Sequence, residues 1–251
     1  ALEWMRRLAL RSPRLWRACA ESVEVALQDS KFARVHLADS IYALAALRGA
    51  DQGAESNLVA ALLNAPETGK AAPKMGAQQA LRLFLSASLL RLPPAPGREG
   101  KTEVAPAPTV DLPLPALLGH AARMARQLPL PDRRALLEAA ETLGDDPEAK
   151  DGGRLSADLA SIRALPVAPL PPLSGMAQAD WGTAEVGPRA LLLPPGIEEL
   201  HGVHLLGFGD TFAGPVPKKK KAKAAPPSVT PSCRLAARAA ELQGWSVELR
   251  A

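Results

Sequence analysis

The spacing of apolar residues along the chain predicts a protein made mostly of amphipathic helices. In several stretches apolar residues recur every three or four positions, which places them on one face of a helix. The helices expected from this pattern cover 3–28, 31–48, 55–64, 76–91, 115–128, 131–143 and 154–165. Because most of the links between them are short, we expect paired helices in the manner of an α-solenoid.

Proline and glycine mark several of the expected helix boundaries. Pro13 is expected to kink or break the first helix, because proline lacks the N–H that a helix interior needs. The Pro93-Pro94 pair is an expected stop. A later helix is expected to begin at Pro131 and to end just before Gly144, the order that helix termini favour.

Two proline-rich stretches contain few residues suited to a core and are predicted to be linkers. The resulting division has five parts. They are a helical repeat-like region at 1–92, a linker at 93–115, a helical region at 116–165, a linker at 166–196 and a C-terminal domain at 197–251.

Two of the expected helices resemble each other. Leu37–Leu47 (LADSIYALAAL) aligns with Ala80–Leu90 (ALRLFLSASLL) at a separation of 43 residues, and Ile41 then matches Phe84. Helices rich in alanine and leucine often align by chance, so an internal repeat and a coincidence both stay open.

The C-terminal part has a different pattern. Residues 200–208 alternate partly and predict a strand. Thr230 and Pro231 suit the start of a helix that ends before Gly244. Apolar and polar residues then alternate over 245–249, which predicts a half-buried strand. A strand, a basic loop, a helix and a strand form a small α/β unit, so the expected fold is mainly α and α+β overall.

The composition supports this fold class. Alanine and leucine account for 88 of 251 residues, whereas aromatic residues make up 4%. A largely β architecture needs more aromatic and β-branched residues and is excluded. No long apolar run is free of charge and proline, so no membrane span is expected. Two cysteines, Cys19 and Cys233, are too few for a disulfide framework.

Positive charge is concentrated at the two ends of the chain. The net charge is only +4, but residues 201–251 hold eight Lys and Arg against three Asp and Glu. Five arginines and no acidic residue lie between Arg6 and Arg17. This distribution favours anionic partners at both ends.

The C-terminal stretch resembles the RAP domain, an RNA-binding module. In that family a helix with Lys or Arg near its start ends in Gly-Trp and continues into a hydrophobic strand. PSCRLAARAAELQGWSVEL at 231–249 has this order, with Arg234, Gly244 and Trp245 in place. The resemblance implies a fold related to restriction endonucleases.

The upstream half of the RAP motif departs from the family. LLGFGDTF at 205–212 stands where the family has its acidic Glu-x-Asp-Gly motif, and Leu206 and Phe208 occupy the carboxylate positions. Nucleases of that fold need clustered carboxylates to hold Mg²⁺. Asp210 alone makes a poor metal site, so we expect no cleavage and no metal.

The N-terminal helices are similar to those that accompany RAP domains. FARVHLADSIYALAALRG at 32–49 is similar to the Leu-Ala-rich helices of octotricopeptide-type and FAST-kinase-type organellar RNA-binding proteins. Together the two resemblances imply that the protein acts on RNA in a mitochondrion, with a plastid as the alternative.

Ten basic side chains are the candidate RNA contacts. Clustered ammonium and guanidinium groups neutralise phosphates and release counterions. A solvated loop, a nuclear-import signal or an ordinary basic surface helix are the alternatives for these groups. The candidates are Lys218, Lys219, Lys220, Lys221, Lys223, Arg234, Arg238, Arg7, Arg11 and Arg14.

The remaining motifs indicate neither a metal site nor a cofactor site. His201 and His204 lack the further ligands that zinc needs and fall on opposite faces of a strand. Gly207 and Gly209 lack the remainder of a dinucleotide or P-loop fingerprint. We therefore expect no enzymatic activity, no cofactor and no small-molecule substrate.

The sequence favours a structural RNA-binding protein of a mitochondrial ribosome, in contact with ribosomal RNA and neighbouring ribosomal proteins. Proline-rich arms have little reason to fold alone but can become ordered on assembly. A trans-acting factor that stabilises or processes an organellar transcript is the alternative. A protein–protein scaffold without RNA affinity is a third class.

Overall fold

The computed structural model describes most of the N-terminal two-thirds of the chain and short pieces of the remainder. The described residues are 12–28, 34–47, 52–92, 112–144, 152–167, 182–186, 189–193, 203–206, 212–213, 228–229, 235 and 247–250. This part of the chain is mainly helical, in agreement with the sequence.

The chain divides into two compact units, which are treated separately below. The first contains α2 (Pro13–Gln28), α3 (Arg34–Leu47), α4 (Gln52–Asn64), α5 (Pro66–Ala71), the 3₁₀ turn η1 (Ala72–Lys74), α6 (Ala77–Arg91), α7 (Leu114–Met124) and the 3₁₀ turn η2 (Ala125–Gln127). The second contains α8 (Leu130–Gly144), α9 (Gly152–Arg163) and a four-stranded sheet.

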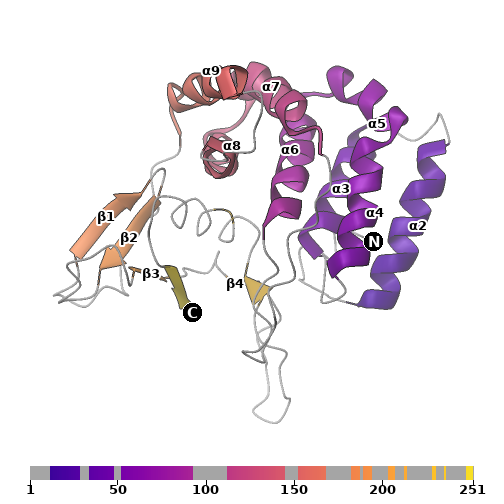
Figure 1. The fold of residues 1–251 in the computed structure, drawn as a ribbon, viewed down its shortest axis with the longest axis horizontal. Coiled ribbons are helices and arrows are strands. Elements are labelled where there is room, and N and C mark those ends of the chain that lie inside the picture. Colours follow the sequence, from indigo (N-terminus) through magenta and orange to yellow (C-terminus); the bar gives the residue numbers. More distant parts are fainter. Residues whose placement is uncertain are drawn as a thin grey trace, which may run out of the picture. The chain divides into compact units, whose positions relative to one another are not determined.

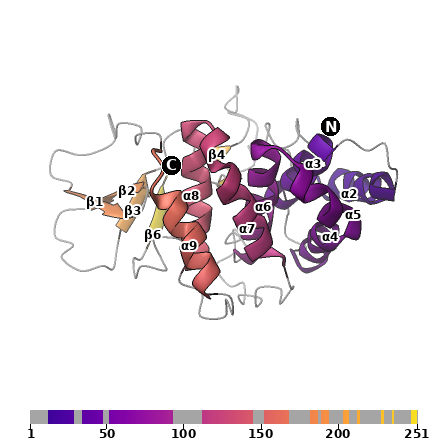
Figure 2. The ribbon, with the colours of Figure 1, turned by 90° about the horizontal axis from the view of Figure 1, so that it is seen from above.

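Helices α3 and α6 form the centre of the first unit. They pack extensively against each other, α7 packs on α6, and α2 and α4 pack on α3 (Figures 1 and 2). Every residue from Leu83 to Leu90 of α6 is buried. Two of these are serines, and each donates its hydroxyl to a carbonyl one turn back, Ser86 to Arg82 and Ser88 to Phe84. This stretch of the central helix is buried on every face, and both serine hydroxyls are satisfied within the helix.

Helix α2 begins at Pro13, and Ser12 precedes it as the capping residue. The Ser12 hydroxyl accepts the Leu15 N–H at 3.4 Å, and the Ser12 carbonyl accepts the Trp16 N–H at 2.8 Å. Proline suits the first helical position because its missing N–H has no intrahelical partner there. The expected break at Pro13 is therefore the start of a helix, and the expected helix upstream of it lies outside the described residues.

Trp16 anchors α2 to α3. Its side chain is 3% exposed, and its indole Nε1 donates to the Leu44 carbonyl at 3.1 Å. Leu44 is one of the last four residues of α3, whose carbonyls lack an intrahelical donor. Trp16 thus lies in the core, where its indole N–H also provides a hydrogen-bond donor for the Leu44 carbonyl at the end of α3.

A short helix that the apolar pattern did not predict follows α4. Ala65 is extended, with φ −58° and ψ 136°, and Pro66 then starts α5. The residue before a proline avoids the helical region, so α4 cannot continue through this point. Buried Thr68 donates its hydroxyl to the Leu62 carbonyl at 2.7 Å and ties α5 back to the end of α4.

The proline signals further along also mark helix ends. Helix α6 stops at Arg91 because Leu92, which precedes Pro93, is extended, with φ −69° and ψ 139°. Helix α8 begins one residue before Pro131 and includes Gly144 as its final residue. The boundaries expected from sequence are therefore correct to within one or two residues here.

In the second unit, α8 and α9 pack against each other through apolar faces. Leu136 and Ala139 of α8 and Leu159 and Ile162 of α9 are buried. An ion pair between Arg163 of α9 and Glu141 of α8 also joins the two helices.

Arg163 binds Glu141 through two nitrogens on one edge of its guanidinium. Nε donates to Oε1 at 2.7 Å and an Nη donates to Oε2 at 2.5 Å. Glu141 is 8% exposed, so the two hydrogen bonds from Arg163 replace most of those that water would otherwise donate to the carboxylate.

The sheet of the second unit has the strand order β1-β2-β3-β6. The strands are β1 (Gly182–Val186), β2 (Arg189–Leu193), β3 (Val203–Leu206) and β6 (Val247–Arg250). The first three pair antiparallel, and β3 pairs parallel with β6. Two further short strands, β4 (Phe212–Ala213) and β5 (Ser228–Val229), pair with each other.

The strands agree with the expectation for the C-terminal domain and differ from it in the linker at 166–196. Strand β3 lies within the strand expected at 200–208, and β6 overlaps the strand expected at 245–249 and ends one residue later. Strands β1 and β2 lie inside 166–196, so part of the range that was expected to be a linker forms a hairpin. The helix expected at 231–243 lies outside the described residues except for Leu235, which is helical and buried.

Candidate nucleic-acid interface

One of the ten candidate RNA contacts, Arg14, lies within the described residues. The lysine run at 218–223, both arginines at 234 and 238, and Arg7 and Arg11 lie outside them. The basic stripe expected from Arg7, Arg11 and Arg14 can therefore be placed only at its last member.

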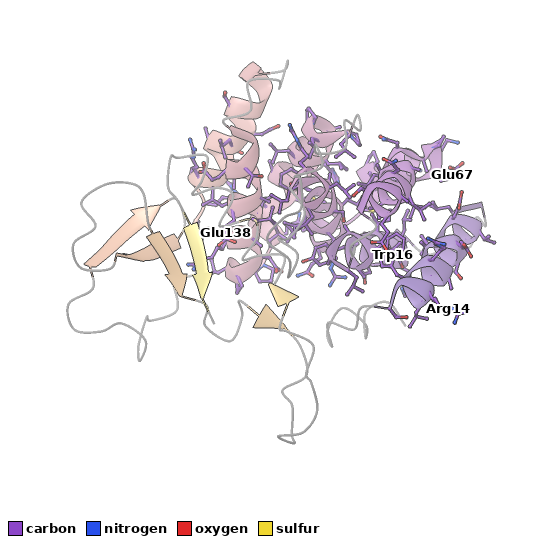
Figure 3. All side chains as sticks on the ribbon, turned by 60° about the horizontal axis from the view of Figure 1, so that its bottom comes forward. Arg14, Trp16, Glu67 and Glu138 are labelled. Carbon is purple, nitrogen blue, oxygen red and sulfur yellow. The ribbon has the colours of Figure 1, made fainter. Side chains whose placement is uncertain are left out.

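Arg14 lies in the first turn of α2 and is exposed, and Arg17, one turn further along, is also exposed. Figure 3 shows Arg14 near the end of the helix and Trp16 turned toward the other helices of the unit. Burial of Trp16, Ala20 and Val23 fixes the rotation of α2 about its axis. The packed face therefore dictates that the arginines face outward.

The order of charges along α2 opposes the helix dipole. The first turn holds no acidic residue and the last turn holds no basic one, while Glu21 and Glu24 follow Arg14 and Arg17. A charge near the unfavourable end of a helix costs about 0.3–1 kcal/mol. Arg14, in the first turn, is therefore at a position where an external anion would be favourable.

Further exposed basic groups lie on elements that the sequence analysis did not single out. Lys70 of α5 and Lys74 of η1 are both exposed. Figure 3 shows Arg14 and Glu67, which shares α5 with Lys70, toward different ends of α2. Both α5 and η1 are too short to show an apolar period, so the sequence carries no signal that could have located these lysines.

The buried acidic residues are not candidates for free catalytic carboxylates. Glu55 is 8% exposed and Glu138, labelled in Figure 3, is 1% exposed. Both interact with other groups of the protein. The third buried glutamate, Glu141, is held by Arg163 as described above.

Among the described residues, no three His, Cys, Asp or Glu side chains are grouped so that they could hold a metal ion. Within the same residues, no helix has the length and apolar character needed to cross a membrane. His204 lies in β3, in register with Leu192 of β2 and Glu248 of β6. His201 lies outside the described residues.

Strand β3 contains one of the two positions at which the RAP motif departs from its family. Leu206, which stands where a carboxylate is expected, is the last residue of β3 and is in register with Arg250 of β6. Phe208, Asp210, Gly244 and Trp245 lie outside the described residues.

Comparison of the chain with protein-family models, with curated proteins and with solved structures gives no match. The likeness to the RAP domain therefore depends on the residues of the tail motif alone.

Proposed function

We propose that this chain is an RNA-binding protein and serves as a structural component of an organellar ribosome, most simply the mitochondrial one. The observation that carries the proposal is the run Lys218–Lys223, which places five lysines among six residues directly before the RAP-like tail. Such a run would neutralise several phosphates at once.

The strand pairing of the second unit supports the proposed α/β fold of the RAP-like part. Strands β3 and β6 pair parallel, and about 40 residues separate them. A parallel pair requires a crossover connection of a dozen or more residues, usually a helix. Leu235, which lies between the two strands in sequence, is helical and buried. This order corresponds to strand, helix and strand.

The charge order of α2 supports an anionic partner at the other end of the chain. Arg14 is exposed in a helix whose dipole disfavours it. A phosphate group near the start of the helix would remove that cost, since helix N-termini favour anions.

The short helical part favours a structural role over sequence reading. Proteins that read RNA with helical repeats use roughly one repeat per base. Among its described residues, the first unit contains the helices from α2 to α7, arranged around α3 and α6. A ribosomal component needs no such length, because the assembled RNA and proteins hold it in place. We propose no catalytic activity for the chain.

The salt dependence of RNA affinity tests the RNA-binding part of the proposal. Each phosphate contact to single-stranded RNA adds about 0.7 to the slope of log affinity against log salt. Replacing all five lysines of the run by glutamine should lower that slope by up to about 3.5. The paired variant Lys70→Gln with Lys74→Gln is the control, because these exposed lysines lie elsewhere on the chain.

Three results would contradict the proposal. A purified chain without salt-sensitive RNA affinity would indicate a protein–protein scaffold. An equal loss of slope per lysine in the control pair and the five-lysine variant would indicate nonspecific attraction by net charge. Binding to a single transcript sequence, without association with ribosomes, would favour the trans-acting factor.

A further inference from the structure

The lysine run of the proposed RNA contact lies in the sequence between two short strands that pair with each other. Four residues separate the end of β4 from Lys218, and four separate Lys223 from the start of β5. Because β4 and β5 form a two-stranded sheet, the two ends of the segment 214–227 are held together. The chain therefore carries the five lysines at the centre of a closed segment and not on an open tail.

The division of the chain into two compact units passes through the same short sheet. Phe212 and Val229 belong to the second unit, whereas Ala213 and Ser228 are grouped with the first. The chain thus leaves the second unit within β4 and returns to it within β5. Strand pairing and chain packing therefore agree that the base of the segment 214–227 lies at these two strands.

Two proline-containing arms of equal length flank the lysine run. The arm after β4 reads Gly-Pro-Val-Pro at 214–217, and the arm before β5 reads Ala-Ala-Pro-Pro at 224–227. Proline has no N–H for a strand ladder, so the arms do not favour extension of the pairing beyond β4 and β5. Proline also restricts φ and makes a chain stiffer than a glycine- or serine-rich linker. The arms therefore suit spacers between the closed base and the lysines.

The five lysines are the only charged residues of the segment. Residues 211–240 contain no Asp or Glu, so no acidic neighbour in sequence neutralises the ammonium groups. Like charges this close repel one another, and gathering them on a phosphate backbone also costs conformational entropy. A closed base and stiff arms reduce the number of conformations that are lost on binding, which raises the affinity without adding a contact.

We propose that β4 and β5 are positioning elements, which close the segment 214–227 and thereby preorganise its five lysines for the phosphates of RNA. This inference rests on the proposed RNA-binding function. The lysines make the phosphate contacts, whereas the short sheet acts through them by holding the two ends of the segment together. Closure therefore sets the affinity, and the number of lysines sets the dependence of affinity on salt.

Cutting the segment at one point tests the proposal. A recognition sequence for a specific protease is inserted between Ala224 and Ala225 of the full chain, and affinity for a labelled single-stranded RNA is measured before and after cleavage. Cleavage opens the segment but leaves all five lysines attached to β4, and the two new chain ends carry opposite charges. We expect the affinity to fall about three- to tenfold at each salt concentration, with an unchanged slope of log affinity against log salt.

The same recognition sequence inserted within 145–151 provides the matched control. This link joins α8 to α9, which pack against each other, so cleavage there should leave RNA affinity unchanged. Equal affinity before and after cleavage of the segment 214–227 would overturn the proposal, because closure would then have no effect. A slope that falls together with the affinity, or an equal loss of affinity after the control cut, would also overturn it.

Substitutions at the base give a second readout without cleavage. Ala213→Pro with Ser228→Pro removes a backbone N–H from each strand and should lower the affinity to the same extent. Ala225→Pro is the control, because it adds a proline to an arm and leaves both strands intact. Unchanged affinity of the double variant contradicts the role of β4 and β5. An uncut chain without salt-sensitive RNA affinity would contradict the proposed function itself, whereas the ratio of cut to uncut affinity tests closure alone.

Discussion

Arg82 of α6 forms an ion pair with Asp39 of α3, and the two residues are 43 positions apart in the sequence. The same separation aligns the two helices in sequence. Positions buried in α3, such as Ile41 and Leu47, correspond to buried positions in α6, Phe84 and Leu90. One pair of equivalent residues of the two central helices is therefore in contact, as expected for neighbouring repeats. The internal repeat itself stays a prediction, which this contact supports.

Breaking the Asp39–Arg82 pair should destabilise the first unit modestly. Both side chains are about a third exposed, at 31% and 28%. A pair in this setting contributes about 0.2–1 kcal/mol to the free energy of unfolding. A double-mutant cycle with Asp39→Asn and Arg82→Gln, followed by urea unfolding, should give a coupling energy in that range. A coupling energy of zero would show that the contact between equivalent positions contributes no stability.

Trp16 should be far more important to stability than its neighbour on the same helix. Trp16→Phe retains an aromatic ring but leaves the Leu44 carbonyl without its indole donor, which should cost about 1–3 kcal/mol. Trp16→Ala also removes the buried ring and should cost about 3–5 kcal/mol.

The exposed Leu15 provides the control for both Trp16 variants. Leu15→Ala should change the free energy of unfolding by less than about 0.5 kcal/mol, because Leu15 is 44% exposed. Denaturant unfolding followed by far-ultraviolet circular dichroism measures all three variants. Equal effects at positions 15 and 16 would contradict the orientation of α2.

The bidentate pair of Arg163 and Glu141 should hold α9 on α8. Arg163→Lys keeps the charge but cannot make the two parallel hydrogen bonds, and Glu141 is too buried for water to replace them. Hydrogen bonds to charged groups contribute about 1.5–3 kcal/mol, so we expect a loss of about 1–3 kcal/mol.

Hydrogen exchange locates the effect of Arg163→Lys. Faster exchange of backbone amides in α9, with unchanged exchange in α3 and α6, is the expected result because those helices belong to the other unit. Uniform acceleration across both units would contradict a local role for the pair.

The helices could be predicted from sequence because two signals agreed. Apolar residues at helical spacing located α3, α4 and α6, and proline fixed where some of them end, as Leu92 before Pro93 shows. Helix α5 was missed because Pro66–Ala71 is too short to show an apolar period. Its structure depends instead on Thr68, whose bond to Leu62 no local pattern indicates.

The candidate interface could be predicted only in part. Local charge identified Arg14 as exposed and basic, and the structure agrees. The burial of Trp16 depends on α3, which is distant in sequence, so a basic helix with a tryptophan looked like an ordinary surface helix. The hairpin of β1 and β2 was missed because proline and glycine content favoured a linker over 166–196.

Sedimentation of an organelle lysate on a sucrose gradient, with this protein followed by mass spectrometry, tests the proposed function most directly. The proposal predicts that the protein migrates with one ribosomal subunit and stays with it at moderate salt. Migration in lighter fractions, with a further shift after RNase treatment, would contradict a built-in ribosomal component and would indicate a transcript-bound factor.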